Sequence, residues 1–152
     1  MKIVLDTNVL VSGLLTPFGP CGEIVRMLAS ADVTLCYDAR ILSEYAEVLA
    51  RPRFRFDPDR VAAILEQIEY RGTPVAAQPL SHSLPDADDE PFLAVALTGN
   101  VVCLVTGNRV HFPYPLCGKA TVLSPAEFLA EWRKLRIEEE EREKDPVAGV
   151  EE

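Results

Sequence analysis

Histidine and cysteine are scarce in this chain of 152 residues, which contains two of the former and four of the latter. None of the cysteines stands in a C-x-x-C pair, so a structural zinc site is not expected. Cys36 and Cys103 fall in apolar runs and are expected to be small buried side chains. We expect reduced thiols, although an even number of cysteines also permits disulfides.

Long apolar runs and a recognisable signal peptide are missing as well. No segment has the length of uncharged apolar sequence that crosses a membrane. The N-terminus lacks the basic region, apolar stretch and small-residue cleavage site of a secretory signal. These absences favour a cytoplasmic protein without a membrane partner.

Positive charge is in short supply, because 24 acidic residues face 15 lysines and arginines and give a net charge of −9. A chain of this charge is not expected to bind nucleic acid indiscriminately. A metal-dependent nuclease is still compatible with it, since carboxylates that gather around metal ions also make a chain acidic.

The hydrophobic fraction of 48% and the length suffice for one domain with a substantial core. Strand-like and helix-like segments alternate, which predicts an α/β fold with a central, mostly parallel sheet flanked by helices. The expected strands cover about residues 2–5, 33–37, 101–106 and 120–123, with a further short one near Val75. The expected helices cover about residues 9–15, 22–29, 39–50 and 89–97, and two more begin near Pro58 and Pro125.

Residues 1–136 are expected to form the domain, and residues 137–152 a charged tail. The last helix of the domain has a strong start, because Ser124 and Glu127 make a capping box around Pro125. The composition after residue 136 predicts a solvated, disordered segment. The alternative is that this segment extends the last helix toward a partner.

Asp6 is the most informative single residue. It follows Lys2–Leu5, a run typical of a buried parallel strand. It therefore stands where the carboxyl ends of strands gather reacting groups in open α/β folds. A carboxylate beside an apolar strand requires a partner, and a metal ion is one candidate. The alternative is that Asp6, Thr7 or Asn8 serves only to cap the following helix.

Two further acids occupy comparable places. Glu44 lies near the boundary of the buried face of the helix over residues 39–50, and Asp89 stands at a helix start, because Pro91 fits only in a first turn. Taken alone, Glu44 is a solvated helix residue and Asp89 belongs to a charged helix start stabilised by the helix dipole. Taken together with Asp6, they predict a metal site.

Four segments occur in the order and spacing of the PIN-domain family of metal-dependent ribonucleases, which the chain resembles from Met1 to about Leu135. They are Ile3–Ser12, Ile41–Pro52, Asp86–Leu93 and Leu104–Asn108. Within the family, the chain looks most like the toxin components of bacterial toxin–antitoxin pairs. The resemblance implies a single PIN-like domain that hydrolyses RNA phosphodiester bonds with a divalent metal ion.

By this resemblance, Asp6, Glu44 and Asp89 are catalytic residues that bind Mg²⁺ or Mn²⁺, the ions that oxygen ligands prefer. Many members have a fourth acid where this chain has Asn108, whose carbonyl oxygen can bind a metal ion but adds no charge. Whether one or two ions bind is therefore open, and Asp88 is a possible substitute. Four polar residues are expected to support the ligands through hydrogen bonds: Thr7, Asn8, Ser12 and Thr106.

An RNA substrate must approach these acids, so cations are expected nearby. Arg109 follows the motif strand and is expected to contact a phosphate. Arg51 and Arg53 alternate with phenylalanines and could contact phosphates and bases, or else solvate a loop whose aromatic rings fill the core. His111 could also reach the substrate, although a structural role in its loop is the stronger interpretation.

The resemblance further implies a cognate antitoxin as partner and allows a homodimer. Two other functions compete with it. One is a PIN-like fold that no longer cleaves and serves as a binding or assembly module, which Asn108 keeps open. The other is a haloacid-dehalogenase-like phosphatase with Asp6 as nucleophile. In that family the lysine precedes the acidic pair, whereas Lys119 follows Asp88 and Asp89.

Overall fold

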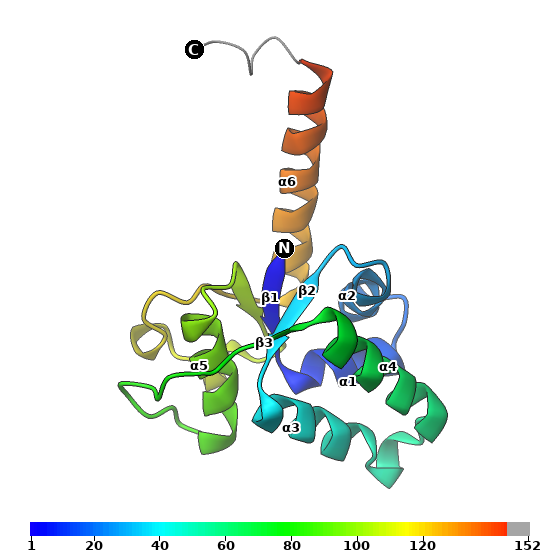
Figure 1. Cartoon of the computed structure of the whole chain (residues 1–152), viewed down its shortest axis with the longest axis vertical. Helices are drawn as coiled ribbons and strands as arrows, with labels where there is room; N and C mark the ends of the chain where they lie inside the picture. Colours follow the sequence, from blue (N-terminus) through cyan, green and yellow to red (C-terminus); the bar gives the residue numbers. More distant parts are fainter. Residues whose placement is uncertain (146–152) are drawn as a thin grey trace.

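A single parallel sheet organises the molecule in a computed structural model, which describes residues 1–145. Within these residues five strands stand in the order β3-β2-β1-β4-β5, and every neighbouring pair is parallel (Figure 1). The strands are β1 (Lys2–Leu5), β2 (Thr34–Tyr37), β3 (Thr73–Pro74), β4 (Cys103–Val105) and β5 (Val122–Leu123). This arrangement confirms the α/β prediction and the short strand expected near Val75.

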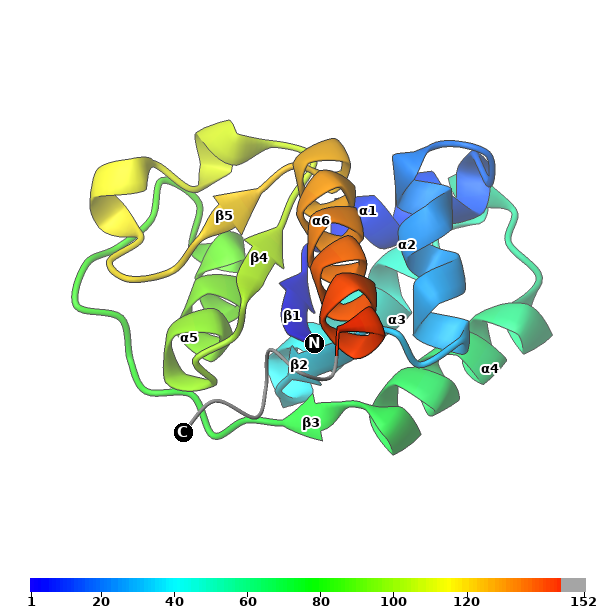
Figure 2. The same cartoon turned by 90° about the horizontal axis from the view of Figure 1, so that it is seen from above.

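Helices cover both faces of this sheet. The α-helices of the described chain are α1 (Thr7–Leu15), α2 (Pro20–Ala29), α3 (Ala39–Leu49), α4 (Pro58–Arg71), α5 (Glu90–Thr98) and α6 (Pro125–Lys144). Short 3₁₀ turns connect them, namely η1 (Pro52–Phe54), η2 (Ala87–Asp89), η3 (Arg109–His111) and η4 (Tyr114–Leu116). Helix α5 packs on one face against β1, β2 and β4, while α2, α4 and α6 lie on the other side (Figure 2).

The central strand explains why its sequence is so apolar. Ile3, Val4 and Leu5 are completely buried, because β1 is flanked by β2 and β4 and covered on both faces. Cys36 and Cys103 are buried as expected, and all four cysteines are free. The core therefore holds the carboxyl end of β1, where Asp6 follows, in a rigid setting.

Helix α2 starts two residues earlier than the sequence indicated. Its first residue is Pro20, with Gly19 in the N-cap position, whereas the expected helix began at about residue 22. Proline suits a first helical position because its missing N–H would have no partner there in any case.

The expectation of disorder after residue 136 is wrong for residues 137–144, because α6 continues without a break to Lys144. Glu, Lys and Arg are good helix formers, and acids stand four residues before bases at Glu138 and Arg142 and at Glu140 and Lys144. The last helix is therefore extended, as one part of the alternative expected, while its direction toward a partner stays a prediction. Figure 1 shows α6 projecting from the body, beyond the amino ends of the strands. The rest of the tail, residues 146–152, lies outside the described residues.

No helix in residues 1–145 combines the length and the apolar character needed to span a bilayer.

Candidate functional site

The site is built where β1 and β4 end side by side. Leu5 pairs with Val105, so the next residues, Asp6 and Thr106, leave the sheet together. The Asp6 amide donates to the Val105 carbonyl at 2.9 Å, and the Thr106 hydroxyl donates to Asp6 Oδ2 at 2.8 Å. Thr106 is completely buried and Asp6 is 5% exposed. The fold therefore fixes the Asp6 carboxylate at the carboxyl edge of the sheet.

Helix capping does not account for Asp6. The residue occupies the N-cap position of α1, but its side chain makes no capping hydrogen bond. The two neighbours expected to offer cap chemistry are also used elsewhere. The Thr7 hydroxyl donates to Glu44 Oε2, and the Asn8 side-chain oxygen accepts a hydrogen bond from the Gly107 amide at 3.1 Å. The capping alternative is therefore wrong, because these side chains tie α1 to α3 and to the turn after β4.

Glu44 reaches the same place from α3. The adjacent Tyr45 is completely buried, and its hydroxyl donates to the carbonyl of Leu5, the residue before Asp6. This contact docks α3 onto the end of β1. Glu44 itself is half-buried and bonded to Thr7, which matches the boundary position expected for it.

Asp89 completes the acidic group from η2, immediately before α5. Its side chain is buried, and its Oδ2 atom lies 3.1 Å from Nδ1 of His111 in η3. The two groups are close but poorly aligned, since Oδ2 has no hydrogen-bond partner within the described chain. This contact was not predicted, because a structural role in its loop was the stronger interpretation for His111. Its position shortly after the motif strand was the available signal.

Burial and the charge of Asp6 disfavour the ionisation of the other two acids. Burial raises the pKa of Asp89 to about 6, with the negative charge of Asp6 adding to the effect and His111 opposing it. Burial also raises the pKa of Asp6, partly offset by the Thr106 hydroxyl. The pKa of Glu44 is raised by burial and then by the charge of Asp6, with the Thr7 hydroxyl opposing. A cation placed among them would relieve this repulsion.

These groups fit a hard divalent cation. The unpartnered buried oxygen of Asp89 is the kind of atom that a metal ion satisfies, and carboxylate oxygens suit Mg²⁺ or Mn²⁺. Among residues 1–145, no three His, Cys, Asp or Glu side chains already converge as a coordination cage. This spacing is compatible with Mg²⁺, which keeps several of its waters and binds proteins through few carboxylates.

The remaining predicted supporting residues differ in how closely they approach the acids. The Asn108 backbone amide donates to the Thr106 hydroxyl at 3.1 Å, so Thr106 connects this residue to Asp6 through two hydrogen bonds. Asp88 is exposed and contributes only a charge that raises the pKa of Glu44. Ser12 is exposed on α1, and its hydroxyl has no hydrogen bond in the described part of the chain. The roles assigned to Asn108 and Ser12 stay predictions.

The three predicted substrate-binding arginines lie in two places. Arg109 pairs with Glu127 at 2.7 Å and lies in the same turn, η3, as His111. Arg51 and Arg53 stand beyond the end of α3, where Arg51 pairs with Glu47 at 3.0 Å and Arg53 lies over an aromatic ring. Of the three, Arg51 is close enough to Glu44 for the negative charge of that residue to add to the rise in the pKa of Arg51, which its hydrogen bond with Glu47 mainly causes. Arg109 follows the motif strand but is paired with Glu127.

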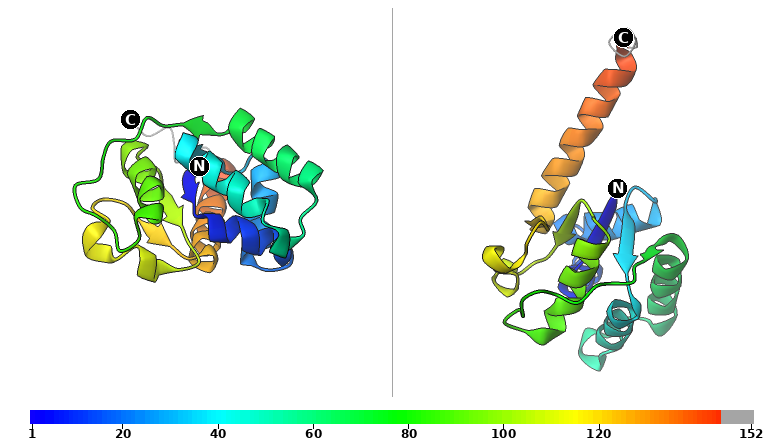
Figure 3. Two further views of the ribbon diagram at one scale, coloured as in Figure 1. Left: turned by 90° about the horizontal axis from the view of Figure 1, so that it is seen from below. Right: turned by 60° about the vertical axis from the view of Figure 1, so that its left-hand side comes forward.

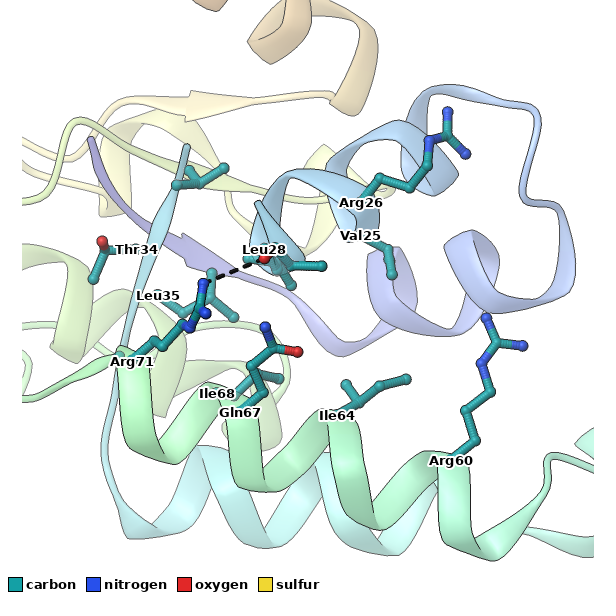
Figure 4. A pocket seen from close by; sticks show the side chains of 13 residues that line it. Val25, Arg26, Leu28, Thr34, Leu35, Arg60, Ile64, Gln67, Ile68 and Arg71 are labelled. Carbon is teal, nitrogen blue, oxygen red and sulfur yellow. Dashed lines mark hydrogen bonds between the residues drawn. The ribbon is translucent and has the colours of Figure 1, made fainter. Parts of the chain in front are cut away.

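A separate cavity of about 230 Å³ lies between α2, α4 and β2 (Figure 4). Its lining is mostly apolar, and Arg71 crosses one side to donate to the Ala29 carbonyl at 3.2 Å. Among the described residues, none of the three acids lines this cavity. This cavity is therefore not the site that the acids define.

The raised pKa of Asp89 predicts a stabilising substitution. Because the folded-state pKa of about 6 exceeds the ordinary value of 3.8, folding stability falls as the pH rises through that window. Asp89→Asn removes this effect and should stabilise the metal-free protein near neutral pH by about 1–3 kcal/mol. The difference in stability between the variant and the wild type is measured by thermal unfolding in EDTA, at neutral pH and at a pH near 3.8, the ordinary pKa of an aspartate.

The exposed neighbour provides the matched control. Asp88→Asn should change stability by less than about 0.5 kcal/mol at either pH. A metal-free Asp89→Asn protein that is less stable than the wild type at neutral pH would contradict the electrostatic interpretation.

Comparison with known proteins agrees with the fold and the motif order. A family model for the PIN domain matches residues 2–110. The uncharacterized protein MJ1680 of Methanocaldococcus jannaschii is 24% identical over 153 residues, which is 88% of this chain and 93% of that protein.

Three solved structures share the fold at low sequence identity. FitAB bound to an IR36 DNA fragment has a TM-score of 0.58 at 20% identity, over 82% of this chain and 95% of that chain. VapBC2 from Rickettsia felis, bound to a DNA fragment from their promoter, has a TM-score of 0.54 at 14% identity, over 82% and 98%. FitAcB from Neisseria gonorrhoeae has a TM-score of 0.52 at 19% identity, over 83% and 99%. Because the family model spans most of the chain and includes all three acids, the chain belongs to the PIN domain family.

Proposed function

We propose that the protein is a divalent-metal-dependent endoribonuclease. One observation carries the proposal: Asp6, Glu44 and Asp89, from three distant segments, are near enough for their charges to interact, and Asp89 Oδ2 is buried without a hydrogen-bond partner in residues 1–145. Carboxylates held together against their own repulsion are a property of sites that bind cations. The match to the PIN domain model favours a nuclease over the haloacid-dehalogenase-like alternative.

The three acids would have different tasks. Asp6 and Asp89, both buried, would hold Mg²⁺ or Mn²⁺. The bound ion would supply Lewis-acid activation of water and would balance the charge that develops on the scissile phosphate. Glu44 is more exposed and has a raised pKa, so its carboxylate is suited to accept a proton from the attacking water. Thr7 orients that carboxylate, and Thr106 orients Asp6.

Two glutamates on α3 allow a matched test of this function. Wild-type protein should cleave labelled single-stranded RNA with Mn²⁺ and lose the activity in EDTA. Glu44→Gln should lower the rate about 10²- to 10³-fold, as expected for loss of a proton acceptor. Glu47→Gln removes an exposed ion pair with Arg51 and the smallest of the contributions that raise the pKa of Glu44, so it should stay within about threefold of the wild type.

Several outcomes would contradict the proposal. Equal cleavage in Mn²⁺ and in EDTA would exclude a metal-dependent nuclease. Equal rates for the two glutamine variants would remove Glu44 from the mechanism. A wild type that binds Mn²⁺ in a calorimetric titration but cleaves no RNA would favour the binding-module alternative.

We also propose that the protein is the toxin of a toxin–antitoxin pair and acts in the cytoplasm. The resemblance in sequence supports this role. The fold shared with FitAB and with VapBC2 supports it as well, and the VapBC2 structure contains a DNA fragment from their promoter. A small open reading frame beside the gene, whose product co-purifies with this protein and inhibits RNA cleavage, is the expected finding. A second copy of the chain is another possible partner, to be tested by the mass of the purified protein in solution.

A further inference from the structure

The negative charge of this protein is unevenly distributed, and one stretch is free of acids. No Asp or Glu occurs between Pro91 and Ala126, although the chain contains 24 acidic residues. This stretch includes β4, η3, η4 and β5, and it carries the cations Arg109 and Lys119. A polyanionic substrate that must reach an acidic site meets the least repulsion along such a surface.

The turn segment Gly107–Thr121 lies next to the acidic group. It begins directly after β4, and its His111 lies 3.1 Å from Asp89. Figure 3, left, looks onto the carboxyl ends of the strands and shows this segment, in yellow, beside α5 at the β5 edge of the sheet. A nucleic-acid strand with its scissile phosphate at the acids would have this segment within reach of the adjoining nucleotides.

Buried side chains and internal hydrogen bonds hold the turn segment in a fixed conformation. Phe112 and Cys117 are 3% and 1% exposed, and the Cys117 thiol donates to the carbonyls of Phe112 and Pro113. The Cys117 amide closes η4 by donating to the Tyr114 carbonyl at 3.2 Å. Pro115, next to Tyr114, further restricts the backbone. A binding group on this support loses little conformational freedom when a ligand arrives.

Tyr114 is the group that this support presents to solvent. Its side chain is 90% exposed, although a tyrosine usually buries much of its ring. It lines a cavity of about 330 Å³ together with Arg109 and Lys119. Gly118 adopts a φ of 57°, a left-handed conformation that lets the chain turn there and places Lys119 on the same cavity.

The ion pair of Arg109 does not prevent it from contacting a substrate. Its contact with Glu127 is solvent-exposed on both sides, with side chains 55% and 42% exposed. Exposed pairs of this kind are worth little and exchange readily with other anions. The arginine can therefore contact a phosphate from where it stands.

We propose that the turn segment Gly107–Thr121 is a subsite for single-stranded RNA, in which a nucleobase stacks on Tyr114 while Lys119 and Arg109 contact the adjoining phosphates. An exposed aromatic ring flanked by cations is the arrangement by which proteins bind single strands with little sequence preference. The inference rests on the proposed function, because it assumes that RNA is the substrate of the acidic site. It adds the path along which that RNA lies.

Binding without cleavage tests the subsite. The probe is a fluorescein-labelled single-stranded RNA of about twelve nucleotides, titrated with the full chain in EDTA and low salt and followed by fluorescence anisotropy. Tyr114→Ala should weaken binding about 5- to 50-fold through loss of stacking, and Tyr114→Phe should restore it to within about twofold. Lys119→Ala should weaken binding about threefold and reduce the salt dependence by about 0.7 in log–log slope.

Matched controls separate the subsite from general surface effects. Tyr70→Ala removes another tyrosine, 88% exposed on α4, and Lys134→Ala removes an exposed lysine on α6; both should bind like the wild type. Equal affinities for Tyr114→Ala and Tyr70→Ala, or no RNA binding by the wild type, would overturn the proposal. If RNA binds through Tyr114 but is not cleaved with Mn²⁺, the subsite stands and the nuclease function fails.

Discussion

Asp6→Asn is expected to lower Mn²⁺-dependent RNA cleavage on the order of 10³-fold, which corresponds to about 4 kcal/mol of lost transition-state stabilisation. Asparagine has the shape of the aspartate and can still accept the Thr106 hydrogen bond, so the change removes charge and little else. Cleavage rates at saturating RNA and the Mn²⁺ affinity measured by calorimetry should fall together.

The fold should survive this substitution. Burial raises the pKa of Asp6, which means that its ionised form opposes folding near neutral pH. The metal-free Asp6→Asn protein should therefore unfold at the same temperature as the wild type or at a higher one. An inactive variant with a preserved melting temperature separates a role in catalysis from a role in structure.

Asp32→Asn is the matched control. Asp32 is exposed and accepts a hydrogen bond only from the nearby Ser30 hydroxyl, so its variant should cleave at the wild-type rate. A contaminating ribonuclease would cleave equally in every preparation. Retention of cleavage by Asp6→Asn within about threefold of the wild type would exclude the metal-binding role assigned to Asp6.

Phe128→Ala should destabilise the protein by about 3–5 kcal/mol, a large part of the 5–15 kcal/mol that a domain of this kind possesses. Phe128 is 1% exposed where α6 packs against β4 and β5. The match to the family model ends at residue 110, before this helix begins. The substitution therefore tests whether α6 belongs to the core of the domain.

A residue further along the same helix supplies the comparison. Ile137 is 56% exposed on the projecting part of α6, and Ile137→Ala should change stability by less than about 0.5 kcal/mol. Urea unfolding followed by circular dichroism gives both values. Indistinguishable midpoints for the two variants would show that α6 contributes nothing to the core.

The sequence was sufficient for those features that depend on local pattern. The run before Asp6 predicted a buried strand, and Ile3, Val4 and Leu5 are completely buried. Each acid could be placed at a strand end or on a helix, because hydrophobic period and proline position report on a single element. The family order of these segments then implied that the acids meet.

Contacts between elements could not be predicted in this way. The Thr7 hydroxyl reaches Glu44 across 37 positions, and His111 approaches Asp89, because α3 and η3 dock at particular angles that no local pattern encodes. The prediction of disorder for residues 137–144 was wrong for another reason. Their composition resembles that of disordered chains, but a helix already nucleated on the body at Ser124 can propagate through such residues.

The order of the strands has a consequence for biosynthesis. Asp6 is translated well before Thr106, its hydrogen-bond donor, which follows 100 positions later. Strand β1 stands between β2 and β4, so its second edge stays open until β4 has been translated. Non-local parallel pairing of this kind forms late and slowly. A ribosome-bound fragment that ends before β4 therefore lacks both the strand and the Thr106 hydroxyl that fix the Asp6 carboxylate, so the acidic group can take its final arrangement only after β4 has been translated.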